Sequence, residues 1–123
     1  MTARLSLAFV GGCIGGALRL LIGLLWETGD GLPWQLLAIN LVGSFAIGAV
    51  GVLWGGRHHL WPLLGPGLLG GFTTFSGIAA MHHVTGVGPL TNVVVLAVSM
   101  VVCSAAAWAG VAMAERHRLR GPA

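Results

Sequence analysis

Residues 65–76 read Gly-Pro-Gly-Leu-Leu-Gly-Gly-Phe-Thr-Thr-Phe-Ser, and they carry the most specific structural signal in the chain. It lies inside an apolar run from about Leu60 to Met81, which is long enough to cross a bilayer. Its glycines, its proline and two adjacent β-branched threonines all weaken a helix. The sequence therefore predicts a membrane helix broken near mid-membrane, with freed carbonyls satisfied by neighbouring helices, water or a cation. The alternative is a continuous, kinked helix closed by threonine back-bonding.

The rest of the chain is equally apolar. Of its 123 residues, 56% are hydrophobic, only 7% are charged and 21 are glycine, a composition that excludes a solvated globular domain. Turn-forming residues separate four apolar runs, which are 5–26, 34–54, 60–81 and 90–114. A cleaved signal peptide is a poor alternative for the first run, because no small-residue cleavage site follows it. We therefore expect an all-α membrane protein, one domain over residues 1–123 with four transmembrane helices.

Positive charge lies on one side of the predicted membrane topology. With four spans, both termini and the second loop share a side, and the first and third loops hold no arginine. The arginines on the shared side are Arg4, Arg57, Arg116, Arg118 and Arg120. The positive-inside rule places both termini in the cytoplasm, in a multi-pass protein of the cell membrane. The net charge of +3 then reflects topology, and nucleic-acid binding is not indicated.

The polar residues inside the spans favour an anion. No acidic residue lies within a span, which removes the usual carboxylate of a proton-coupled exporter and any carboxylate pair for hydrolysis, so we expect no enzyme. The interior polar residues are donors or cations, namely Arg19, Asn40, Ser44, Thr73, Thr74, Ser76, Ser99 and Ser104. A path lined by such groups favours an anion. Because four helices barely surround a water-sized path, transport requires an oligomer.

Three motifs resemble those of the Fluc/CrcB fluoride channels. Residues 11–19, Gly-Gly-Cys-Ile-Gly-Gly-Ala-Leu-Arg, are similar to the family's glycine-rich first span. Residues 40–45, Asn-Leu-Val-Gly-Ser-Phe, resemble its asparagine motif, and residues 70–76 resemble its helix-break signature. The motifs follow the family's order and spans. The resemblance implies a passive fluoride-selective channel that exports cytoplasmic fluoride and protects against fluoride toxicity.

The resemblance also implies an assembly and a set of site residues. The assembly is an antiparallel dimer with two fluoride pathways and a structural sodium ion, Na+, that is not transported. By motif position, backbone carbonyls of Gly70 and Thr73 hold the sodium. Asn40 is then the pore amide, Phe75 the first pore phenylalanine and Arg19 the vestibule cation. The hydroxyls of Thr74, Ser76 and Ser99 are further hydrogen-bond donors along the ion pathway.

Two departures leave alternatives open. Ile78 stands where the family has its second pore phenylalanine, and the polar track of the fourth span is reduced to Ser99 and Cys103. A small multidrug-type transporter shares the size and span number but needs an intramembrane glutamate that this chain lacks. A non-conducting helper subunit is the other alternative. The partner is either a second copy or a paralogous subunit, since the arginine bias disfavours insertion of one sequence in both orientations.

Overall fold

The described part of the chain is helical throughout. A computed structural model describes residues 1–26, 32–55, 58–80 and 86–120, and these ranges contain no strand. The elements are α1 (Thr2–Leu25), α2 (Trp34–Trp54), η1 (Leu63–Leu69), α3 (Gly70–Phe72), α4 (Ser76–Ala79) and α6 (Pro89–Arg120). The predicted all-α class is confirmed.

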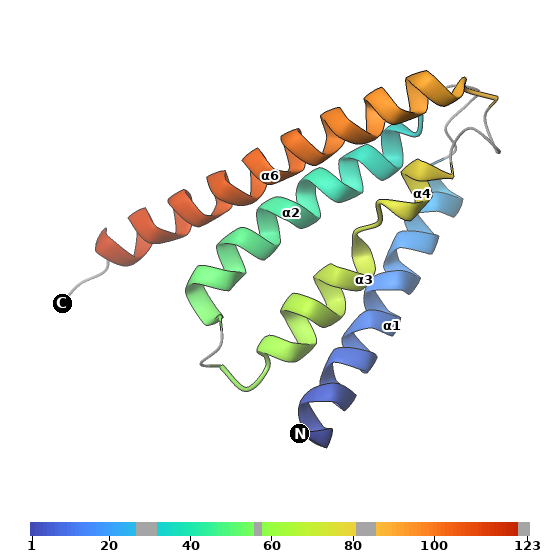
Figure 1. The fold of residues 1–123 in the computed structure, drawn as a ribbon. Helices are drawn as coiled ribbons and strands as arrows, with labels where there is room; N and C mark the ends of the chain where they lie inside the picture. Colours follow the sequence, from blue (N-terminus) through green and yellow to red (C-terminus); the bar gives the residue numbers. More distant parts are fainter. Residues whose placement is uncertain (27–31, 56–57, 81–85, 121–123) are drawn as a thin grey trace.

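Three of these elements, α1, α2 and α6, are long and apolar enough to cross a membrane, and the helical run Leu63–Ala79 is shorter. Figure 1 shows α1 beginning, α2 ending, the short run beginning and α6 ending at the same end of the molecule. This up-and-down course matches four passes of the chain. The predicted break is also present, because α3 ends at Phe72 and α4 begins at Ser76.

The helix α6 extends past the predicted end of the fourth span at residue 114. Its apolar run stops there, but the following residues, up to Arg120, include neither glycine nor proline, so nothing ends the helix. At 32 residues α6 is about 48 Å long, against about 30 Å of hydrocarbon. The last turns, with His117, Arg118 and Arg120, therefore stand outside the apolar layer.

A wide turn precedes the break. Residues Leu63–Leu69 form a π-helix that contains Pro66. Proline has no N–H and its ring crowds the carbonyl four residues earlier, and a wider turn relieves both problems. The N–H of Gly70 accordingly reaches back five residues to the carbonyl of Gly65 and also to that of Gly67. The segment is thus irregular at two places and is not one continuous helix, although the threonine back-bond of the alternative is present, from Thr73 Oγ1 to the Leu69 carbonyl at 3.0 Å.

Glycines bring the helix backbones into contact. Helix α2 packs along α6, and α1 packs along η1 and α3 (Figure 1). A Cβ on Gly48 would meet the carbonyl of Ala107, and one on Gly110 would meet the carbonyl of Phe45. Between α1 and the short run, Gly11 has the same role against the backbone at Leu63. Small residues at such contacts are the usual means of helix association in lipid, where burial of apolar surface gives no driving force.

We expect Gly15→Ala to destabilise the fold and Gly16→Ala to be tolerated. A methyl group on Gly15 would meet the carbonyl oxygen of Leu68 and lie 2.8 Å from the amide nitrogen of Phe72, whereas one on Gly16 would meet no atom within 4 Å. Overpacking of this kind costs about 1–3 kcal/mol. Thermal unfolding followed by circular dichroism in detergent measures the difference. Equal melting temperatures for the two variants would contradict the close packing of Gly15 against the backbone of Leu68 and Phe72.

Candidate functional site

A buried asparagine bridges the break between α3 and α4. At Thr73 the backbone is extended, with φ −79° and ψ 151°. The Nδ2 atom of Asn40 donates to the carbonyl oxygen of Thr74 at 2.7 Å, and its Oδ1 accepts the Thr74 N–H at 2.6 Å. The Asn40 side chain is completely buried. Because a buried amide left unpaired is costly, this two-point contact fixes the extended backbone to α2.

Two hydrogen bonds at the break replace helical ones and free backbone carbonyls. In a continuous helix the N–H of Thr74 would bond the carbonyl of Gly70, but here it donates to Asn40. Likewise the N–H of Gly77 would bond the carbonyl of Thr73, but it donates to Thr74 Oγ1 at 3.2 Å. Gly70 and Thr73 therefore each keep a carbonyl without its helical donor. These are the two residues that the family resemblance assigns to sodium, and the carbonyls of Gly71 and Phe72 between them likewise accept no backbone hydrogen bond from residues 75 and 76.

The donor set at the break fits a hard cation held by carbonyl oxygens. Unwound backbone carbonyls are how discontinuous membrane helices coordinate Na+. Across the described ranges no group of three or more His, Cys, Asp or Glu side chains is placed to hold a metal. Two carbonyl oxygens alone do not replace the hydration of an ion, so further ligands would be needed to complete such a site. Gly70 is exposed at the surface of this subunit, where a second copy can reach it.

A polar hollow lies on one side of the break. We call it the arginine hollow; its volume is about 710 Å³. Arg19, Thr74 and Ser76 line it, together with Leu20, Gly23, Leu24, Gln35, Leu36, Ile39, Gly77 and Ala80. The hydroxyls of Thr74 and Ser76 are 3.1 Å apart and share a hydrogen bond. Three predicted site residues are thus brought together around one opening.

A second hollow is lined by Phe75, the residue between Thr74 and Ser76. The phenylalanine hollow, about 220 Å³ in volume, is lined by Phe75, Ser44, Ile47, Met100, Cys103, Ser104 and Ala107. Phe75 is 40% exposed. Thr74 and Ser76 therefore line one hollow, whereas Phe75 between them lines the other.

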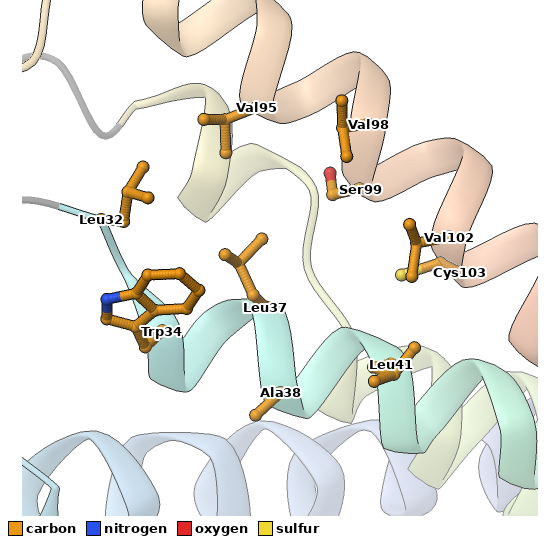
Figure 2. Close-up of a pocket in the computed structure, with 10 residues that line it drawn as sticks. All are labelled: Leu32, Trp34, Leu37, Ala38, Leu41, Val95, Val98, Ser99, Val102 and Cys103. Carbon is orange, nitrogen blue, oxygen red and sulfur yellow. The ribbon is translucent and has the colours of Figure 1, made fainter.

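Ser99 lies apart from the phenylalanine hollow. It lines an apolar groove of about 410 Å³ between α2 and α6, where Figure 2 shows its oxygen and the sulfur of Cys103 among hydrocarbon side chains. The Ser99 hydroxyl donates to the Leu96 carbonyl at 2.8 Å, so its own helix satisfies it. Cys103 lines both the groove and the phenylalanine hollow. The structure therefore places Cys103, rather than Ser99, beside Phe75.

Ile78 is completely buried inside the subunit. Near it, Asn92 Nδ2 donates to the carbonyl of Ala79 at 2.7 Å and holds the end of α4 against α6. Sequence reasoning missed Asn92 and also Gln35, because both lie close to span ends and look interfacial. It recognised Ser44 and Ser104 as interior polar residues but did not assign them to the site.

Comparisons with known proteins place the chain in a family by its sequence. Residues 6–111 match the family described as "CrcB-like protein, Camphor Resistance (CrcB)". Among curated proteins, Fluoride-specific ion channel FluC of Agrobacterium fabrum is 39% identical over 120 residues, covering 89% of this chain and 94% of the relative.

Two further relatives are matched over a shorter region. Fluoride-specific ion channel FluC 1 of Cutibacterium acnes is 42% identical over 81 residues, covering 59% of this chain and 57% of the relative. Fluoride-specific ion channel FluC 2 of Nocardia farcinica is 47% identical over 72 residues, covering 54% and 51%. The chain thus spans little more than half the length of these two relatives. No solved structure matches. On its match to the family and to the full-length relative, the chain belongs to the CrcB family.

Proposed function

We propose that this chain is a subunit of a passive, fluoride-selective channel that exports cytoplasmic fluoride and so protects against its toxicity. The observation that carries the proposal is the break itself, where Thr74 and Ser76 line a hollow with an arginine and Phe75 lines a second one. Relatives of this chain are named fluoride-specific ion channels, which supports the choice of ion.

The chemistry at the break suits a small, strongly hydrated anion. Such an ion gives up water only where close donors replace it, and the edge of a phenylalanine ring carries the positive end of its quadrupole. Thr74 Oγ1 accepts the Gly77 N–H, and one of the Thr74 and Ser76 hydroxyls donates to the other, which leaves one hydroxyl proton free to donate to an ion in the hollow. Arg19 raises the local anion concentration. A negative-inside potential then drives an anion outward by about 2.3 kcal/mol per 100 mV.

The conducting unit is an antiparallel dimer. Phe75, Ser76 and Gly70 are exposed at the surface of one subunit, where an ion pathway would be open to lipid. A second copy in the opposite orientation closes the hollows and brings two more carbonyls to those of Gly70 and Thr73. When bound there, Na+ supplies a fixed central charge that holds the two breaks together. It is structural and is not transported.

The partner is a second copy or a paralogous subunit. The arginine bias favours one orientation, with both termini cytoplasmic when the chain is expressed alone. The buried Ile78 leaves this subunit without the family's second pore aromatic. A paralogue of opposite charge bias would supply both the inverted orientation and that aromatic edge.

We expect liposomes that contain only this chain to release fluoride down its gradient and to retain chloride. A fluoride electrode, with valinomycin and potassium to balance charge, measures the initial rate. Asn40→Ala removes both bonds to Thr74, each worth about 1 kcal/mol, and so is expected to slow release at least tenfold.

The matched control is Val42→Ala, on the exposed face of the same helix, which is expected to leave the rate unchanged. Equal efflux of chloride and fluoride through the parent would refute the proposal. If the chain alone releases no fluoride but does so when co-reconstituted with a paralogue, the obligate partner is the paralogue.

Sodium is expected to stabilise the dimer and not to cross with fluoride. Replacing all sodium with N-methylglucamine removes the ion that fits carbonyl oxygens. We expect the dimer fraction on size exclusion and the fluoride rate to fall together, and sodium to restore both. Unchanged dimer and rate after complete exchange would mean that the site is absent.

The dimer proposal also predicts the membrane orientation of the chain when it is expressed alone. A single cysteine introduced at position 32, in a Cys13→Ser, Cys103→Ser background, reports the side on which the first loop lies. In cells expressing only this chain we expect an impermeant maleimide to label it from outside. Comparable labelling from both sides would show dual insertion and would remove the need for a paralogous partner.

A further inference from the structure

The arginine hollow contains a buried acceptor that has no donor. Gln35, near the start of α2, lines this hollow, and its Oε1 is shut off from solvent without a hydrogen-bond partner. Its Nε2 lies 3.9 Å from the position that a Cβ on Gly23 would occupy, so the amide rests against α1. A buried acceptor left unpaired is costly, so a donor is expected nearby.

The matching donor lines the same hollow. Arg19 lies one helical turn before Gly23 on α1, and it is half-buried. In the part of the chain that the structure describes, its guanidinium makes neither an ion pair nor a hydrogen bond, although it carries five N–H donors. Neighbouring turns of α1 and α2 thus hold, at one opening, an acceptor and a donor that pair with nothing among the described residues.

We propose that Gln35 is the positioning residue for Arg19, with Oε1 accepting one guanidinium N–H. An amide is a neutral acceptor, so the guanidinium keeps its full positive charge and most of its donors for an incoming anion. Without the amide, the long side chain is free to extend toward the interface near Trp26, seven residues and about 10 Å along the helix. Gln35 therefore holds the charge beside Thr74 and Ser76.

The pairing itself is tested without any transport. Phenylglyoxal modifies free guanidinium groups, and mass spectrometry gives the modification rate of each arginine in the detergent-solubilised protein. We expect Gln35→Leu to speed modification of Arg19 about tenfold, as for the loss of a charge-assisted hydrogen bond, with Arg4 unchanged as internal standard. Leu21→Ala, on the exposed face of α1, is the matched control. An Arg19 rate that Gln35→Leu leaves unchanged would overturn the proposal.

The consequence for fluoride rests on the proposed function and has its own measurement. In liposomes, Arg19→Ala and Gln35→Leu are each expected to raise the half-saturating fluoride concentration several-fold with a similar maximal rate, as for a lost steering charge. The double variant is expected to match Arg19→Ala, because Gln35 acts through Arg19. Gln35→Glu pairs the arginine with a carboxylate and is expected to raise the same concentration while keeping Arg19 slow to modify.

These measurements distinguish the positioning role of Gln35 from the proposed fluoride channel. Additive effects in the double variant would overturn the positioning role while leaving the channel proposal intact. If the parent itself carries no fluoride, the proposed function fails, and the phenylglyoxal rates still decide whether Gln35 holds Arg19.

Discussion

The amide of Asn40 and the backbone of Thr74 form the contact on which the rest of the site depends. By taking the Thr74 N–H, Asn40 ends one helical segment, and by donating to the Thr74 carbonyl it fixes the extended connection before the next. Two features of the break accompany this contact. Side chains at 74 and 75 diverge to different hollows, and the carbonyls of Gly70 and Thr73 lose their helical donors. One buried side chain thus determines the backbone course at the break.

Asn40 also joins two halves of the fold that pack separately. Helix α1 lies along η1 and α3, and α2 lies along α6, with backbones brought close by glycines. Direct packing between α1 and α2 is slight by comparison. Because lipid gives no hydrophobic driving force between helices, close backbone packing and a few buried hydrogen bonds have to hold the halves in register. The fully buried Asn40 is therefore part of the architecture of the subunit.

Sequence reasoning was most successful where the signal is local. Apolar run length located the helices, and the glycines, proline and threonines of residues 65–76 located the break. It could not show which residue would seal the break, since the partner of Thr74 lies 34 positions away. Nor could it foresee that Ser99 turns back to its own helix while Cys103 reaches Phe75, because helical spacing alone does not decide how a hydroxyl is satisfied. Gln35 was missed because its position near a span end resembles an ordinary interfacial residue.

The complete burial of Ile78 affects how this sequence can evolve. Substitution of a residue that lines an ion pathway affects conduction. Substitution of a residue buried inside the subunit, such as Ile78, also disturbs the packing around it. Enlarging a well-packed side chain strains its neighbours, typically by about 1–3 kcal/mol. A phenylalanine at position 78 would therefore need more than one substitution, because the residues packed around this position would have to become smaller to accommodate the ring.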